Sequence, residues 1–198
     1  MDSSEIQQLK RDLLYQVAAL KQQALLPAEK GELDAVVQQL ELLNPTRLPL
    51  SPVNRSLLLG RWKLIYASNG TVVTRQLAGG ISINEIWQIL NIFQEETIAV
   101  TNGMELELPL LGKLQMQAQG LWQQQDNMQT ARVTFDAFSL QATGLFHQPN
   151  WQFPALHIPI LEWMRREASW QTTYLDSELR IGQGVTGNRF VFMRQISC

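Results

Sequence analysis

Residues 113–123 read KLQMQAQGLWQ, and apolar residues alternate with polar ones along this segment. The apolar positions are Leu114, Met116, Ala118, Gly120 and Trp122. Because successive side chains of a β-strand point to opposite faces, a period of two gives the strand one dry and one wet face. Such strands are typical of antiparallel sheets that cover a core on one side and meet water on the other.

The same period recurs on both sides of this segment. It is found in residues 61–67 (RWKLIYA), in 132–137 (RVTFDA), where Val133, Phe135 and Ala137 share a face, and in 189–194 (RFVFMR). Several such strands joined by short turns predict a sandwich or a barrel. We expect the dry face of a barrel to enclose a cavity or groove lined by Trp62, Leu64, Tyr66, Leu114, Met116, Trp122, Val133, Phe135, Phe190 and Phe192.

The N-terminal part of the chain follows a helical period instead. Residues 3–26 carry one apolar stripe that Pro27 ends, and residues 29–43 carry a second. Three prolines in NPTRLPLSP then predict an extended connector. We therefore expect a helical segment with a Pro-rich connector over 1–56 and a β-barrel domain over 57–198. The two helices either pack on the barrel or dock on a membrane or a partner, and their few basic residues favour packing.

The composition limits the class of protein. The formal net charge is −2 and charged residues make up 17% of the chain, whereas a nucleic-acid-binding protein needs a basic face. The one cysteine, Cys198, permits no internal disulfide. No apolar run reaches the ~18 residues of a membrane span, and the acidic N-terminus fits neither a signal peptide nor a transit peptide. We expect an intracellular protein, soluble or peripheral, and the prior removal of a transit sequence stays open.

Residues 181–190, IGQGVTGNRF, contain the spacing G-x-G-x-x-G at Gly182, Gly184 and Gly187. A dinucleotide-binding turn needs a helix after these glycines and an acidic residue about 20 positions later. Here an alternating segment, NRFVFMRQI, follows, and the sequence ends at Cys198. The glycines therefore predict a hairpin between two strands, with positive φ where the chain reverses, and no nucleotide site.

Residues that could carry catalysis are sparse. His147 and His157 have no nearby ligand pair that would complete a metal site, and no G-x-S-x-G elbow marks a nucleophile. The pairs Glu95–Glu96 and Glu105/Glu107 lack the apolar surroundings of a catalytic carboxylate pair. We expect no enzyme activity, no metal and no cofactor. In the β-rich region only residues 159–168, PILEWMRREA, could form a turn or two of helix.

Gly60, Arg61 and Trp62 open the first predicted strand, and Arg194 lies in the last. This G-x-W with a late arginine resembles the signature of the lipocalin-like (calycin) barrels, in which the arginine packs over a tryptophan that closes one end. A guanidinium over an indole face gains about 0.5–2 kcal/mol, depending on burial. The resemblance implies that Gly60, Trp62 and Arg194 have a structural role in closing the barrel.

Two longer segments resemble the plastid lipid-associated protein (PAP/fibrillin) family. LELLNPTRLPL and LLLGRWKLIYAS are similar to its entry segment, a helix followed by LNPTP and G-x-W-x-L-x-Y-T-S. TTYLDSELRIGQGVTGNRFVFMR is similar to its closing segment, YLD-x-x-LRI-x-RG-x-x-G-x-x-FV. The chain departs from the family pattern at Arg47, which replaces a proline, and at Gln183, which replaces an arginine. Gln183 cannot reproduce a charged contact made by that arginine.

The resemblance implies a lipocalin-like barrel of a cyanobacterium, or of a plastid if the chain is a trimmed precursor. It implies binding or sequestration of an apolar small molecule, such as a carotenoid, a quinone or another isoprenoid lipid, at a thylakoid or lipid-globule surface. Two alternatives stay open: a lipocalin-like chromophore (bilin) lyase or chaperone, and a structural coat of lipid bodies without an internal ligand. Nucleic acids and nucleotides are not expected partners.

Asp176 and Arg180 lie in the family-like segment YLDSELR. In a continuous strand they would share a face about 13 Å apart, and a turn at Asp176–Ser177 would bring them within reach. In one interpretation each residue fixes the closing hairpin through a turn hydrogen bond or an ion pair. In the other they are polar anchors for a ligand head group at the barrel mouth.

Overall fold

The computed structural model describes residues 3–28, 31–71, 74–76, 81–94, 97–109, 112–143, 154–159 and 168–195. Some residues considered above lie outside these ranges, namely His147, Cys198, Glu95–Glu96 and residues 160–167 of the candidate helical turns.

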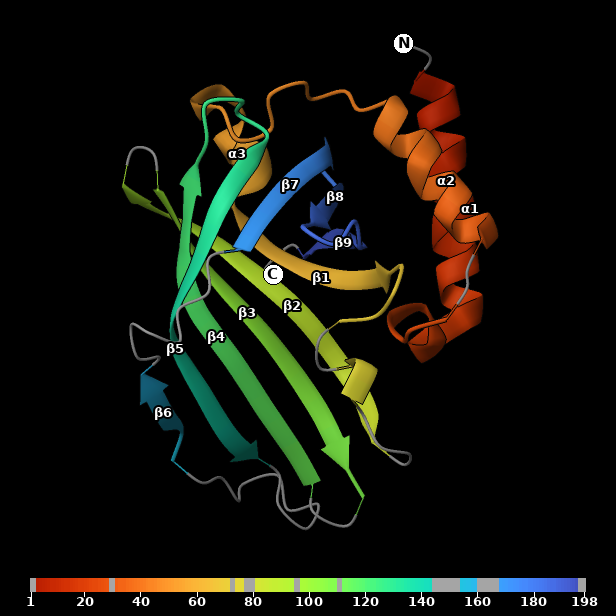
Figure 1. Ribbon diagram of the computed structural model, residues 1–198. Coiled ribbons are helices and arrows are strands. Elements are labelled where there is room, and N and C mark those ends of the chain that lie inside the picture. Colours follow the sequence, from red (N-terminus) through yellow and green to blue (C-terminus); the bar gives the residue numbers. More distant parts are fainter. Residues whose placement is uncertain are drawn as a thin grey trace.

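The strands form one nine-stranded antiparallel sheet in the order β4-β3-β2-β1-β9-β8-β7-β5-β6. An additional pairing of β4 with β5 closes the sheet in a ring (Figure 1). The antiparallel sheet predicted from the alternating segments is confirmed. The strands are β1 (Gly60–Ala67), β2 (Ser82–Gln94), β3 (Thr97–Leu108), β4 (Gly112–Gln124), β5 (Thr130–Thr143), β6 (Leu156–Pro159), β7 (Ala168–Leu175), β8 (Leu179–Gly184) and β9 (Arg189–Gln195).

The ring has walls of unequal height. β2 to β5 have 12 to 14 residues each, whereas β1, β7, β8 and β9 have 6 to 8. β7 pairs with β5 over Thr130–Val133, and β6 pairs with it over Ala137–Leu140. The long strands therefore extend beyond the closed part of the ring as a curved sheet (Figure 1).

Helices cover the outer face of the ring beside the short strands (Figure 1). α1 (Ser3–Leu20) continues into the 3-10 helix η1 (Lys21–Leu25), and α2 (Gly31–Leu42) packs beside α1. The predicted helices are confirmed, although the first changes to 3-10 geometry at Lys21, whose φ is 51°. The short elements η2 (Pro52–Asn54) and α3 (Arg55–Leu58) precede β1, and η3 (Thr74–Gln76) follows it. A domain boundary at residue 56 stays a prediction.

Two apolar cores lie on the two faces of the sheet. The inner core fills the closed part of the ring and includes Leu58, Trp62, Leu64, Trp122, Val133 and Phe192. The outer core lies between the helices and the short strands and includes Leu13, Leu33, Val37, Leu40, Tyr66, Tyr174, Ile181 and Val191. The apolar stripes of both helices therefore pack on the sheet, as the few basic residues of this segment indicated.

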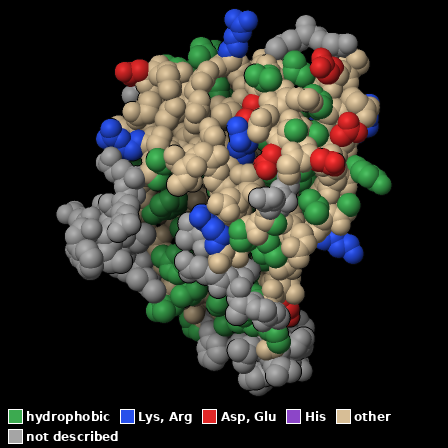
Figure 2. Space-filling view, turned by 45° about the vertical axis from the view of Figure 1, so that its right-hand side comes forward, with side chains coloured by type: hydrophobic (Ala, Val, Ile, Leu, Met, Phe, Trp, Pro, Cys, Tyr) green, Lys and Arg blue, Asp and Glu red, His purple; other side chains and the backbone are tan. Residues whose placement is uncertain are grey.

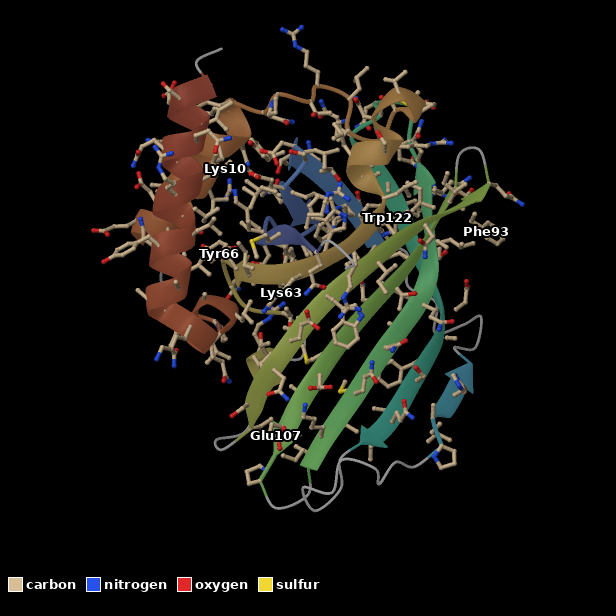
Figure 3. All side chains as sticks on the ribbon, turned by 180° about the vertical axis from the view of Figure 1, so that it is seen from behind. Lys10, Lys63, Tyr66, Phe93, Glu107 and Trp122 are labelled. Atoms are coloured by element: carbon tan, nitrogen blue, oxygen red, sulfur yellow. The ribbon has the colours of Figure 1, made fainter. Side chains whose placement is uncertain are left out.

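A β-bulge overturns the prediction for Tyr66. Leu64 pairs with Phe192 and Tyr66 pairs with Val191, so Ile65 is an extra residue in β1. One extra residue reverses the alternation, and Tyr66 consequently belongs to the outer core. Its hydroxyl donates to Asp34 Oδ1 of α2, and Figure 3 shows Tyr66 beside the helices. The ring interior that was predicted to include Tyr66 does not contain it.

A second bulge changes the face predicted for part of β5. Gln119 pairs with Ala137, and Gly120 pairs with Phe135, which leaves Asp136 as the extra residue. Beyond this point the inward positions are shifted by one. Phe138, rather than Ala137, therefore faces the ring interior.

The glycine-rich segment is the hairpin between β8 and β9, as predicted. Gly187 has a φ of 77°, and its N–H donates to the carbonyl oxygen of Gly184 at 2.9 Å. Gly182 has a different role, because a Cβ atom at this position would lie 2.1 Å from the Trp170 ring. The missing side chain therefore makes room for an indole.

Candidate ligand-binding cavity

A cavity of about 490 Å³ lies against the inner face of the ring. Its apolar wall includes Leu64, Met104, Met116, Phe138, Phe190 and Phe192, with Trp170 beside them. Gln88 and Asn102 add polar groups, and exposed Arg75 marks the side that meets solvent. Figure 2 shows apolar side chains gathered below the wider part of the molecule, where the surface is hollowed. A volume of this size is typical of small-molecule sites, which range from about 300 to 1,000 Å³.

The other end of the ring is closed by Trp62, which is fully buried. Its indole Nε1 donates to the carbonyl oxygen of Leu58 in α3 at 2.8 Å. Cζ of Arg194 lies 4.2 Å from the centre of the Trp62 ring, and the two residues pair across β1 and β9. The predicted packing of this arginine over this tryptophan is confirmed.

Backbone carbonyls hold Arg194 in place over that ring. Its guanidinium donates to the oxygens of Leu59 at 2.7 Å and of Ser177 at 2.8 Å, and also to the oxygen of Leu57. Gly60 has a φ of 116°, and a Cβ atom there would lie 3.1 Å from Nη1 of Arg194. The Gly60 position therefore requires glycine both for its backbone and for the space that the guanidinium occupies.

Arg180 is fully buried inside the ring. Nη2 donates to Gln88 Oε1 at 2.5 Å, whereas Nε and Nη1 have no hydrogen-bond partner among the described residues. Cζ lies 4.5 Å from the centre of the Phe192 ring and 5.1 Å from that of Trp62. Burial, together with the nearby charge of Arg194, lowers the pKa of Arg180 to about 9, so the side chain stays cationic at neutral pH.

Asp176 lies apart from Arg180, in the turn between β7 and β8. Its Oδ1 accepts hydrogen bonds from the N–H groups of Glu178 and Leu179 at 2.8 and 2.6 Å. Its Oδ2 accepts from Lys10 of α1 and from the Tyr174 hydroxyl, each at 2.8 Å. Burial alone would raise the pKa of Asp176, but these hydrogen bonds outweigh it and lower the pKa. The carboxylate thus fixes the turn and holds α1 to the sheet.

The remaining predicted lining residues fall into three groups. Leu64, Met116, Phe190 and Phe192 line the cavity. Trp62, Trp122, Val133 and Phe135 belong to the inner core towards the closed end, and Figure 3 shows Trp122 near that end. Leu114 is half-buried in β4, and it is not among the described residues that line the cavity or form the inner core.

Several residues of the cavity were not predicted from the sequence. Trp170 follows the alternation of ASWQTTYL in β7, which could have identified it as inward-facing. Phe138 is displaced by the bulge at Asp136, and no sequence signal marks that bulge. Gln88 and Asn102 are polar residues on strands, where solvent exposure is the usual expectation.

Groups suited to other chemistry are engaged elsewhere or dispersed. His157 is exposed in β6, and Glu105 pairs with Lys113 at 3.0 Å. Burial would raise the pKa of Glu105, but hydrogen bonds from Asn84 and Lys113 lower it. Within the described ranges no cluster of three His, Cys, Asp or Glu residues could hold a metal ion. The helices in those ranges include none with the length and apolar character needed to cross a membrane.

Comparisons with known proteins identify the family of this chain. A chloroplastic plastid lipid-associated protein 3 of Brassica campestris is 24% identical over 201 residues, covering 84% of this chain and 54% of that protein. The chain therefore spans about half the length of this curated relative. No solved structure matches the chain. The PAP_fibrillin family model matches residues 7–193, from α1 to β9, and the chain therefore belongs to the PAP/fibrillin family.

Proposed function

We propose that this protein binds an apolar small molecule, an isoprenoid lipid such as a carotenoid or quinone, in the cavity of its ring. The observation that carries the proposal is the cavity of about 490 Å³, whose wall is mainly aromatic and aliphatic. An apolar ligand would remove these side chains from water, and each Å² of apolar surface so covered contributes roughly 25 cal/mol.

The family supports the same reading. The Brassica relative is named a plastid lipid-associated protein, and we extend a lipid association to this chain. The closed end with Trp62 and Arg194 supports a lipocalin-like barrel, a fold whose size suits one small ligand. The proposed place of action is a thylakoid or lipid-globule surface, where such molecules are found.

Organic extraction of the natively purified protein tests the proposal. We expect the mass spectrum of the extract to contain one apolar species in stoichiometric amount. A covalently bound bilin would instead favour the lyase alternative. An empty protein that also fails to bind added quinone would favour the structural coat.

A matched pair of variants tests whether the cavity is the binding site. Met116→Trp fills the cavity, whereas Met193→Trp makes the same change at an outward position of β9 that is 36% exposed. Titration with a short-chain plastoquinone analogue should quench Trp fluorescence in the parent and in Met193→Trp, with affinity lost in Met116→Trp. Millimolar ATP and NADH should leave the melting temperature of the parent protein unchanged, because the glycine segment is a hairpin. Equal quinone affinity in both variants would place the site elsewhere.

A further inference from the structure

We propose that the inner end of the cavity is a subsite for a carboxylate, so that the ligand is a lipid acid bound with its head group towards Arg180. This inference rests on the proposed function, because it specifies the polar end of the molecule that the cavity takes.

Arg180 is fully buried and does not itself line the cavity, and its guanidinium lies behind two residues of the cavity wall. Its Nη2 donates to Gln88 Oε1, and its Cζ lies over the ring of Phe192. Both Gln88 and Phe192 line the cavity. The rings of Trp62 and Trp122 lie at 5.1 and 5.6 Å from Cζ. Aromatic rings attract the faces of a guanidinium, but they leave its N–H edges without acceptors. Nε and Nη1 are such edges, and neither has a partner in the described part of the chain.

Arg180 also fixes the direction of a short hydrogen-bond relay. An arginine can only donate, so Gln88 must present its carbonyl oxygen to Arg180. The amide of Gln88 then donates to Asn102 Oδ1 at 2.7 Å. This leaves Asn102 Nδ2 as a donor at the cavity wall. Trp170 Nε1, on another wall, is also buried without an acceptor. These unpaired groups of Arg180, Asn102 and Trp170 are all donors, and a ligand group that accepts hydrogen bonds would satisfy them.

The charge at this end selects among accepting groups. Arg180 is cationic, forms no ion pair among the described residues, and lies near a second guanidinium, that of Arg194. A buried charge without a partner is costly, and a carboxylate both neutralises a guanidinium and accepts two of its N–H groups. A quinone carbonyl would accept hydrogen bonds without neutralising the charge, and a hydrocarbon would do neither. A carboxylate is therefore the best match.

A comparison of oleic acid with methyl oleate tests the subsite, with displacement of uncharged Nile red as the readout. The two probes share one chain and differ in the charge of the head group. Because hydrogen bonds to charged groups are the stronger ones, we expect the parent protein to bind the acid about tenfold or more tightly than the ester.

Gln88→Glu supplies an internal carboxylate to Arg180 with almost no change of volume. We expect this variant to lose the preference for the acid while it keeps the affinity for the ester. Arg180→Met, which removes the charge, should give the same result. Arg75→Met removes an exposed cation at the cavity wall and should retain the preference, since we place the head group at the inner end.

The outcomes separate the two proposals. If Nile red, acid and ester all fail to bind the parent protein, the proposed function is wrong. If the ester binds as tightly as the acid, only the carboxylate subsite is wrong. A preference that persists in Gln88→Glu, or one that disappears in Arg75→Met, would also overturn the subsite. Thermal melting of each variant without ligand is the control for stability. If Arg180 had only a structural role, its substitution would change the melting temperature but not the ratio of the affinities for the acid and the ester.

Discussion

Trp62 joins several parts of the fold through one side chain. Its indole N–H binds the carbonyl of Leu58 in α3, and its ring contacts the guanidinium groups of Arg180 and Arg194 from β8 and β9. The indole thus connects α3, which covers the closed end, to β8 and β9, which complete the ring of strands. Trp62 is therefore both a core residue and a connector.

Trp62→Ala should lower the free energy of unfolding by ~3–5 kcal/mol, the usual cost of deleting a buried aromatic ring. Arg194→Ala should cost less, because the indole stays buried while the carbonyls of Leu57, Leu59 and Ser177 lose their donor. Arg194→Lys should recover part of the loss, since an ammonium cannot lie flat on an indole. Urea denaturation of the two single variants, Trp62→Ala and Arg194→Ala, and of the double variant measures the coupling energy between the two residues. Strictly additive effects would contradict the contact.

Gly182→Ala should destabilise the protein by about 1–3 kcal/mol, because its Cβ would lie 2.1 Å from the Trp170 ring and force repacking. Gly31→Ala is the matched control, since a Cβ atom there meets nothing within 4 Å at the start of α2. Thermal denaturation should show a lower midpoint for the first variant and an equal or higher one for the second. Equal midpoints would mean that the indole does not occupy the space beside Gly182.

Single residues also mark the limit of what the sequence predicts. Phe190, Phe192 and Arg194 share a face because β9 alternates regularly, and this was predictable. The burial of Arg180 was not, because a charged side chain is ordinarily expected at the surface. Its inward position depends on the pairing of β8 with β9, which places Arg180 opposite Phe192.

The elements are held together by polar contacts as well as by the cores. Lys10 of α1 is 5% exposed and pairs with Asp176 and Glu178 of the turn between β7 and β8. Burial alone would lower the pKa of Lys10, but these two carboxylates outweigh it and raise the pKa. The helical segment is thus attached to the sheet by an ion pair in addition to the outer core.

Asp176→Asn should lower the free energy of unfolding by about 1.5–3 kcal/mol near pH 7, the range for hydrogen bonds to charged groups. The pKa of Asp176 is lowered in the folded state, so its contribution is present above about pH 4 and is lost as the pH falls through that lowered pKa. The raised pKa of Lys10 means that its contribution is lost only as the pH rises above about 10.5.

Denaturation of the parent and Asp176→Asn at several pH values checks this expectation. The difference between them should be constant from about pH 5 to 8 and should shrink towards pH 3. Asp12→Asn is the matched control: it removes a carboxylate of α1 that accepts a hydrogen bond from Gln8, and it should change stability little. A difference that is unchanged at pH 3 would show that the ion pair does not contribute.

The sequence predicted where strands form, but it did not predict which face some side chains of β1 and β5 lie on. Hydrophobic alternation reports which residues share a face only while pairing is regular. The bulges at Ile65 and Asp136 each insert one residue, and the faces of β1 and β5 reverse beyond them. Tyr66 and Ala137 were assigned to the wrong side for this reason. Bulges arise from tertiary packing of the ring, which a local pattern does not contain.

At the scale of the whole molecule, the two apolar cores have different roles. The outer core attaches the helices, and the inner core closes the ring above the cavity. The sequence predicted both the helical segment and the antiparallel sheet, because each has a clear period. It did not predict that the ring closes over only part of the long strands, since strand length alone does not specify which residues pair. If the proposed function holds, the open remainder is the side from which a ligand would enter the cavity.

The closing of the ring depends on β9, which follows every other described strand along the chain. Arg194 binds the carbonyl of Leu59, 135 positions earlier, and β1 has its second neighbour only once β9 is available. The hairpins β2 to β5 join neighbouring segments, whereas the β1–β9 pair must close a long loop, and such distant contacts form slowly. We therefore expect the curved sheet to form before the ring closes while the chain is being synthesised. We expect a chain stopped before residue 189 to keep the β2 to β5 hairpins but to lack the closed end and the cavity wall that Phe190 and Phe192 provide.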